Sequence, residues 1–272
     1  MNSTLFADCL RTILLLSFVQ CASAQEVPSA KPLLKAHAHN DYLHERPLLD
    51  ALEHGFCSVE ADIFLVDGKL LVAHSFLELR PQRTLEKLYL LPLRARIRKH
   101  SGFVYADKTP FTLLIDIKNN GDETYEALSQ LLLKYRDVFS HTADGQRQER
   151  AVIAIISGDR ATAKIISDDS RIAGIDGRLA DIDSGMPVLQ MPVISDNWRK
   201  NFRWSGKGVI SAEERTKLNE IVRKVHSKGR RLRFWATPDT PAAWKVLKDA
   251  NVDLINTDNL AGLAKFLSKP NR

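Results

Sequence analysis

The sequence predicts an α/β protein of the (β/α)8 TIM-barrel class, and three observations support this prediction. Eight short apolar runs typical of β-strands recur between residues 33 and 257. Amphipathic stretches typical of helices lie between them. The chain has 272 residues, which suits one barrel of about 250 residues. An open doubly wound sheet is the alternative, but no G-x-G-x-x-G or phosphate-loop motif follows an early run.

The expected strands recur along almost the whole chain. A short extra run, Lys69–His74, follows the turn Val66-Asp67-Gly68-Lys69, so we expect it to pair with the second strand as a hairpin. The eight main runs are Leu33–His39, Ser58–Val66, Thr112–Lys118, Val152–Ser157, Arg171–Asp176, Val188–Ile194, Leu232–Thr237 and Asp253–Thr257. Eight such units predict one catalytic barrel domain over residues 25–272.

Three stretches between or after the runs show helical spacing on one apolar face. Ser211 and Glu214 have the spacing of a capping box at the start of the second stretch, and Gly229 follows its cationic last turn. The apolar faces are Leu128, Leu131, Leu132, Tyr135 and Phe139 in the first stretch, Leu218, Ile221, Val222 and Val225 in the second, and Leu260, Leu263, Ala264 and Leu267 in the third.

The composition is that of a folded protein with a mildly basic charge. Hydrophobic residues make up 44% of the chain and charged residues 26%, which excludes disordered, collagen-like and low-complexity proteins. Lysine plus arginine number 39 and aspartate plus glutamate 33, so the formal net charge is +6. This balance suits an anionic substrate or surface. Dense basic tracts are missing, so nucleic acid is not an expected partner.

Residues 1–24 have the pattern of a secretory signal peptide. The apolar run Ile13–Val19 is followed by Ala22-Ser23-Ala24, which matches the small-residue cleavage pattern before Gln25. Cleavage after Ala24 predicts a secreted or periplasmic protein. It would leave Cys57 as the single cysteine, and we interpret this residue as a small buried hydrophobe.

Polar residues interrupt the first two apolar runs near their ends, where a barrel carries its chemistry. His37 and His39 are two residues apart, so on an extended strand they point the same way. Glu60 and Asp62 have the same spacing on the second run. Two carboxylates held this close repel each other unless a positive group lies between them. A divalent cation such as Mg²⁺ or Ca²⁺ meets this need, and an ion pair with a neighbouring lysine or arginine is the alternative.

The extra run and the third strand add further polar ends. His74 closes the apolar run Leu70–Ala73, and Asp116-Ile117-Lys118 follows Leu113–Ile115. Asp116 and Lys118 could pair with each other, or Asp116 could complete a metal site while Lys118 meets an anionic substrate. Together the histidines, carboxylates and lysine indicate phosphodiester cleavage. In this chemistry a metal offsets the phosphate charge and histidines transfer the protons.

These residues resemble the PLC-like phosphodiesterases, which include glycerophosphodiester phosphodiesterases, phosphatidylinositol-specific phospholipases C and sphingomyelinases D. The match consists of a histidine ending strand one, Glu-x-Asp at Glu60–Asp62, a run ending in His74, and Asp116–Lys118. The chain from about residue 34 to 268 is similar to the "altered inheritance of mitochondria" proteins of fungi and their bacterial relatives. The segments behind this similarity are His37–Tyr42, Ser58–Asp62, Leu114–Lys118, Asp196–Trp198, Arg233–Ala236 and Ile255–Asp258.

The resemblance implies one divalent cation, Mg²⁺ before Ca²⁺, on Glu60, Asp62 and Asp116. It implies His37 and His74 as the acid–base pair, with His37 preferred over His39 by its place in the match. His39 then joins the residues expected to contact the substrate, which are His39, Asn40, Lys118, Trp235 and Asn256. Ala38 and His39 replace the arginine and glycine of the glycerophosphodiesterase pattern, so a glycerol-type substrate is less firmly implied.

The leading hypothesis is an exported, monomeric, metal-dependent phosphodiesterase. Its substrate would be a small-molecule or lipid phosphodiester, cleaved by water or by a hydroxyl of the substrate itself, with peripheral membrane contact for a lipid. A barrel that binds phosphate ligands without turnover is one alternative. A zinc hydrolase of the amidohydrolase type is another, because His37-Ala38-His39 has the H-x-H spacing of such zinc sites.

Overall fold

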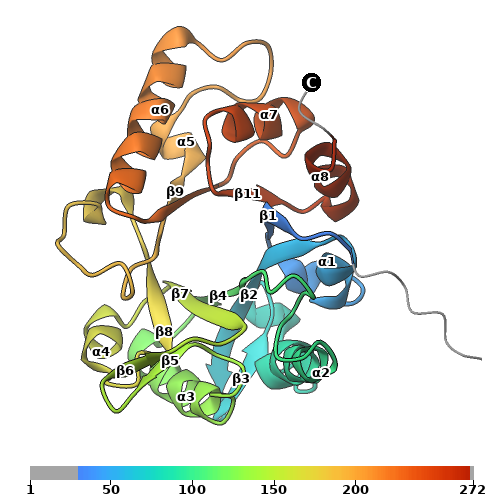
Figure 1. Ribbon diagram of the computed structural model, residues 1–272, viewed down its shortest axis with the longest axis vertical. Coiled ribbons are helices and arrows are strands. Elements are labelled where there is room, and N and C mark those ends of the chain that lie inside the picture. The colour runs from blue at the N-terminus through green and yellow to red at the C-terminus, as the bar shows by residue number, and fades with distance from the viewer. Residues whose placement is uncertain (1–29, 270–272) are drawn as a thin grey trace, which may run out of the picture.

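A computed structural model describes residues 30–269, and within this range eight parallel strands close into a barrel (Figure 1). Each strand pairs with the next, and the pairing of β11 with β1 completes the circle, for example at Ala36 and Ile255. The strands are β1 (Leu33–Ala38), β2 (Phe56–Val66), β4 (Phe111–Ile117), β7 (Val152–Gly158), β8 (Ala173–Gly177), β9 (Val193–Asn197), β10 (Arg231–Trp235) and β11 (Leu254–Thr257). The predicted TIM barrel is confirmed.

Helices surround the barrel, and short elements fill the connections (Figure 1). The helices are α1 (Leu49–Glu53), α2 (Leu91–Lys99), α3 (Gly121–Leu133), α4 (Thr162–Ser167), α5 (Trp198–Asn201), α6 (Ala212–Ser227), α7 (Pro241–Asp249) and α8 (Leu260–Leu267). Single helical turns lie at Asp41–Leu43, Phe76–Glu78, Glu86–Leu90 and Leu179–Asp181. Strands β5 (His141–Ala143) and β6 (Gln146–Gln148) form a separate antiparallel pair.

The predicted hairpin is present as β3 (Lys69–Val72), which pairs antiparallel with the end of β2. Asp67 and Gly68 form its tip with φ of 47° and 72°, and this left-handed pair favours a tight two-residue turn. The returning chain brings Ala73 beside β2, where its N–H donates to the carbonyl of Asp62 at 3.3 Å. The hairpin therefore carries His74 back to the level of the carboxylates on β2.

Two sequence predictions need correction. The sixth strand was expected at Val188–Ile194, but residues 188–190 form a turn and β9 begins at Val193. Prolines 187 and 192 flank that turn, and the carbonyl of Pro187 accepts from the N–H groups of Gln190 and Met191. The strand therefore ends later and presents Asp196 and Asn197 at its carboxyl end.

The first helical stretch is shorter than its apolar spacing predicts. Helix α3 ends at Leu133, so Tyr135 and Phe139 lie beyond it, although both side chains are buried in the core. At the start of α6, Ser211 Oγ accepts from the N–H of Glu214 at 3.1 Å, as predicted. The Glu214 carboxylate does not complete the capping box, because it accepts from the N–H groups of Arg203 and Trp204 instead.

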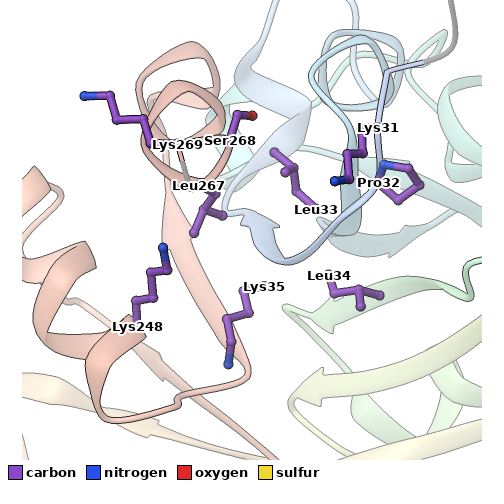
Figure 2. A pocket seen from close by; sticks show the side chains of 9 residues that line it. All are labelled: Lys31, Pro32, Leu33, Leu34, Lys35, Lys248, Leu267, Ser268 and Lys269. Carbon is purple, nitrogen blue, oxygen red and sulfur yellow. The ribbon is translucent and has the colours of Figure 1, made fainter. Parts of the chain in front are cut away.

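A groove outside the predicted site lies at the start of β1 and the end of α8 (Figure 2). It has a volume of about 520 Å³ and is lined by Lys31, Pro32, Leu33, Leu34, Lys35, Lys248, Leu267, Ser268 and Lys269. Because Leu33 begins β1, this groove is at the amino end of the barrel, opposite the strand ends that carry chemistry. No helix within residues 30–269 combines the length and the hydropathy that crossing a membrane requires.

A buried carboxyl group lies just after β1, outside the predicted site. Asp41 Oδ2 accepts from the N–H of Leu48 at 2.6 Å and from the hydroxyl of Tyr89 at 2.9 Å, while Oδ1 has no hydrogen-bond partner among the described residues. Burial raises the pKa of Asp41 to about 7, although the two hydrogen bonds partly oppose this rise. The neutral acid is therefore the form that the fold favours.

We expect Asp41→Asn to stabilise the protein at pH 8 and to change little at pH 4.5. The pKa of Asp41 is about 7 in the folded chain and 3.8 ordinarily, so its contribution to stability is lost as the pH rises from about 4 through 7. The loss is on the order of 4 kcal/mol at most. Thermal unfolding at the two pH values measures the difference. The exposed turn variant Asp67→Asn is the control, and an equal effect of Asp41→Asn at both pH values would contradict the account.

Candidate functional site

A cavity of about 350 Å³ opens at the carboxyl end of the barrel, where the sequence placed the chemistry. Its wall is formed by His39, Asn40, Glu60, His74, Asp116, Lys118, Ser157, Gly158, Arg178, Arg233 and Trp235. Seven of the ten predicted site residues are in this wall. The other three, His37, Asp62 and Asn256, are buried and do not line it.

Three carboxylates gather at one side of the cavity because of strand register. Asp62 on β2 pairs directly with Asp116 on β4, and Glu60 lies two residues earlier on the same face of β2. One oxygen from each carboxylate can be chosen so that all three lie within 4.8 Å of one another. Within the described chain, this is the one group of three or more acidic, histidine or cysteine ligands close enough to hold a metal ion.

Two cations partly offset the repulsion among these carboxylates. Lys118 Nζ lies 2.9 Å from Asp62 Oδ2 and 2.9 Å from Asp116 Oδ1. Arg233 donates to Glu60 Oε2, and its Nε donates to Asn256 Oδ1 at 2.9 Å. The ion pairs considered from the sequence are therefore present, and they use the same carboxylates as the predicted metal site.

Burial and mutual repulsion shift these carboxyl groups in different directions. Burial, and then the charge of Glu60, raises the pKa of Asp62 to about 6, against the effect of Lys118. Burial also raises the pKa of Asp116, which Lys118 opposes. Burial would raise the pKa of Glu60 too, but Arg233 and the hydrogen bond from His37 outweigh it and hold that pKa well below its ordinary value. The site is thus short of positive charge around Asp62 and Asp116.

The residues fit a hard divalent cation. Asp62 Oδ1 is buried and has no hydrogen-bond partner within residues 30–269, which leaves one lone-pair donor of the group unused. All three side chains offer carboxylate oxygen, the ligand that Mg²⁺ and Ca²⁺ prefer. A dication at this point would give the Asp62 oxygen a partner and would add positive charge beside Asp62 and Asp116.

Tyr42 links the carboxylates to His74, and the sequence analysis did not identify it. Its Oη lies 2.6 Å from Asp62 Oδ2, 2.8 Å from Asn40 Oδ1 and 3.0 Å from His74 Nδ1. The chain can place it there because Asn40 takes a left-handed conformation, with φ of 48°, as it leaves β1. The signal available in sequence was its place at the end of the segment His37–Tyr42, one of the segments that carry the family resemblance.

The two histidines of the first strand lie at different depths. His37 is fully buried, with Nδ1 2.7 Å from Ser58 Oγ and Nε2 3.2 Å from Glu60 Oε2. Burial, and then the charge of Arg233, lowers the pKa of His37 to about 4, so its ring is neutral at pH 7. His37 therefore supports Glu60 from beneath the cavity. This placement disfavours the sequence-based preference for His37 over His39 as an acid–base residue.

His39 and His74 are the histidines that line the cavity. His39 Nδ1 lies 2.9 Å from Asp258 Oδ1. Burial alone would lower the pKa of His39, but the hydrogen bond with Asp258 and the charge of Glu60 outweigh it and raise that pKa. His74 is the more open of the two, with 56% of its side chain exposed. Both rings are accessible to a bound substrate.

Ser157, Gly158, Arg178 and Arg233 complete the wall and were not among the predicted site residues. Arg233 was visible in sequence as a charge inside the apolar run Leu232–Phe234. Arg178 follows Asp176 at the spacing of Asp116 and Lys118, a second acid-x-base pair at a strand end. Trp235 lines the cavity as expected, whereas Asn256 lies below it and holds Arg233.

Comparison with known proteins supports the same classification. Residues 28–172, more than half of the chain, match the AIM6-like phosphodiesterase domain. The chain belongs to the AIM6-like phosphodiesterase family. Residues 231–261, which include Arg233, Trp235 and Asn256, also match the glycerophosphoryl diester phosphodiesterase family. The resemblance to PLC-like phosphodiesterases inferred from the sequence motifs is confirmed.

Fungal members of this family align along most of the chain. "Altered inheritance of mitochondria protein 6" of Eremothecium gossypii is 28% identical, over 91% of this chain and 73% of the relative. The homologue from Arthroderma benhamiae is 25% identical, over 84% of this chain and 82% of its own. The alignments therefore cover most of the chain rather than one motif.

Solved structures with similar folds include a glycerophosphodiester phosphodiesterase and a phospholipase C. A glycerophosphodiester phosphodiesterase from Parabacteroides distasonis has a TM-score of 0.54 at 17% identity, covering 88% of this chain and 98% of its own. A calcium-dependent phosphoinositol-specific phospholipase C from Pseudomonas sp. has a TM-score of 0.54 at 13% identity, covering 86% and 93%. At these identities the likeness shows the barrel fold alone.

We expect the protein to bind one Mg²⁺ or Ca²⁺ ion at the carboxylates. Asp62→Asn and Asp116→Asn should each weaken binding at least tenfold, since removal of even outer-shell partners costs about 10–100-fold in metal affinity. Isothermal titration calorimetry with each ion gives the affinities, and Asp144→Asn, in an exposed turn, is the control. Equal affinities in the wild type and both site variants would contradict the assignment. Zn²⁺ binding that depends on His37 and His39 would instead support the amidohydrolase-type alternative.

Proposed function

We propose that this protein is a metal-dependent phosphodiesterase that cleaves a glycerophosphodiester or the headgroup phosphodiester of a phospholipid. The observation that carries the proposal is the cavity itself, which brings Glu60, Asp116, Lys118, His39 and His74 together around one opening. These are the groups that phosphoryl transfer requires. They include ligands for a dication, a fixed cation for the phosphate, and two accessible rings that transfer protons.

The carboxylates and Lys118 would position the phosphate. A divalent ion held by Glu60, Asp62 and Asp116 would offset negative charge on the phosphate oxygens. Lys118 already lies between Asp62 and Asp116, so its ammonium group can contact a non-bridging oxygen of a diester bound there. Arg233 and His37 keep the Glu60 carboxylate in place from below, which fixes the ligand set before substrate enters.

His39 and His74 would carry the protons. One ring accepts a proton from the attacking water or hydroxyl group as the oxygen of that group bonds to phosphorus. The other ring donates a proton to the leaving alkoxide as the bond between phosphorus and the leaving oxygen breaks. The Asp258 carboxylate orients His39, and Tyr42 orients His74. Water as the attacking group gives an acyclic phosphate, and a substrate hydroxyl gives a cyclic phosphate. Phosphorus NMR of the product distinguishes the two.

We expect His39→Ala and His74→Ala to lower kcat by about 10²–10⁴-fold, the usual contribution of a positioned acid or base. His37→Ala should act mainly through Glu60 and weaken the affinity for the metal. The assay is alcohol release from a panel of glycerophosphodiesters and phospholipids with Mg²⁺, Ca²⁺, Zn²⁺ or a chelator. His54→Ala, at the residue that follows α1 and outside the cavity, is the control.

Full activity of either cavity variant would contradict the assigned roles. Tight binding of the panel compounds by the wild type, without any product, would instead support the alternative of a phosphate-binding barrel. Activity confined to the zinc-loaded protein would support the amidohydrolase-type alternative.

We also propose that the chain is exported and cleaved after Ala24, as a monomer that contacts membranes only peripherally. Support comes from the apolar run Ile13–Val19 and the small residues before Gln25. Residues 1–24 lie outside the described part of the structure. We expect mass spectrometry of the protein purified from its native cells to find Gln25 at the amino terminus. A mature chain that still begins at residue 1 would contradict cleavage.

A further inference from the structure

We propose that Arg178 forms a second anion-binding subsite in the cavity, so that the preferred substrates are phosphodiesters with another negatively charged group on one alcohol. This inference rests on the proposed phosphodiesterase function and specifies its substrate class. The anionic group that Arg178 would bind is a carboxylate or a phosphate monoester, because both present two oxygens to a guanidinium.

Arg178 differs from the other two cations that line the cavity. Lys118 is paired with Asp62 and Asp116, and Arg233 is paired with Glu60, so both are held by the predicted metal ligands. Arg178 pairs with Asp176 and contacts none of these three carboxylates. Its position therefore does not depend on whether an ion is bound at the carboxylates.

The contacts of Arg178 leave one edge of its guanidinium available. Nη1 donates to the carbonyl and carboxylate oxygens of Asp176, both at 3.0 Å, and lies 3.1 Å from the carbonyl of Gly177. Nη2 has one long contact, 3.5 Å to Ser157 Oγ, and Nε has no partner among the described residues. The side chain is 28% exposed in the cavity wall. The Nε–Nη2 edge has the geometry that binds a two-oxygen anion.

The residues that hold Arg178 in place are buried and hydrogen-bonded. The Asp176 side chain is fully buried, and its Oδ2 also accepts from Ser157 Oγ at 2.8 Å. Arg160 Nη1 donates to the carbonyl of Asp176 at 2.6 Å, which adds a second cation beside the pair. These contacts fix the guanidinium in place before a ligand arrives, so little side-chain entropy would be lost on binding.

The barrel places Arg178 in the cavity wall two strands away from Asp116 and three strands away from Glu60 and Asp62. It follows β8, which is separated from β4 by β7, while Glu60 and Asp62 are on β2 and Asp116 is on β4. A diester whose phosphate lies at Lys118 would therefore extend one alcohol toward Arg178. The cavity volume of about 350 Å³ is within the range of small-ligand sites. A second anion on that alcohol would meet the free edge of the guanidinium.

The test compares substrates that differ by one anionic group. Glycerophosphoserine differs from glycerophosphoethanolamine by a carboxylate, and glycerophosphoinositol 4-phosphate differs from glycerophosphoinositol by a phosphate. We expect kcat/KM of the wild type to be about tenfold or more higher for the more anionic member of at least one pair, as for a charge-assisted hydrogen bond. The pair that shows the preference identifies carboxylate or phosphate as the natural group.

Arg178 variants assign the preference to this side chain. Arg178→Gln should remove it, while Arg178→Lys should keep part of it because the charge remains without the planar fork. Arg199→Gln, an exposed arginine in α5 just after the next strand, is the matched control and should keep the preference intact. If Arg178→Gln does not fold, the double variant Asp176→Asn/Arg178→Gln replaces it in the same assay, because it leaves no unpaired buried charge.

Two results would overturn the subsite. One is a wild type with no preference within either pair, and the other is a preference that Arg178→Gln leaves unchanged. If the wild type turns over none of the four compounds, calorimetry with the same compounds decides the subsite, while the full substrate panel decides the proposed function separately. Tighter binding of the more anionic compounds by the wild type, lost in Arg178→Gln, would support it, and equal binding would overturn it.

Discussion

Mutual repulsion among Glu60, Asp62 and Asp116 is the constraint on which the rest of the site depends. Parallel pairing of β2 with β4 puts Asp62 beside Asp116, and the two-residue repeat of a strand adds Glu60 on the same face. Three carboxylates in a largely buried position are stable only with positive charge near them. The surrounding side chains supply part of that positive charge.

Different carboxylates receive different compensation. Glu60 has a buried arginine and a neutral histidine, so it is held as an anion. Asp62 and Asp116 share one lysine, and Asp62 keeps an oxygen with no partner in the described chain. This uneven distribution fits a divalent cation bound on the Asp62–Asp116 side. Arg178 pairs with Asp176 and contacts none of these three carboxylates, so we assign it to substrate selection rather than to metal binding.

Most of the fold could be predicted because each barrel strand is a short apolar run with a clear boundary. The exceptions have local causes. Residues 188–190 look like a strand, but the flanking prolines turn the chain there. The helical spacing from Leu128 continues to Phe139, yet α3 ends at Leu133. The non-helical chain that follows α3 still packs Phe139 into the core. Apolar spacing alone did not distinguish these cases.

The sequence predicted which residues belong to the site better than it predicted how deep each side chain lies relative to the cavity. Strand periodicity predicts which face a side chain is on, and on that basis it predicted His37 and His39 on one side, but it does not give their height along the barrel axis. His37 lies beneath the cavity and His39 in its wall, a difference set by the point where β1 ends at Ala38. Arg233 was a visible charge in an apolar run, and its contact with Glu60 spans 173 residues of sequence.

The most direct test of the central claim is anomalous X-ray diffraction from crystals of the protein grown with Mn²⁺ in place of Mg²⁺. The account predicts one strong anomalous peak in the barrel mouth, within bonding distance of carboxylate oxygens from Glu60, Asp62 and Asp116. A mouth without a peak, or a peak bound by His37 and His39 with the carboxylates uninvolved, would contradict it.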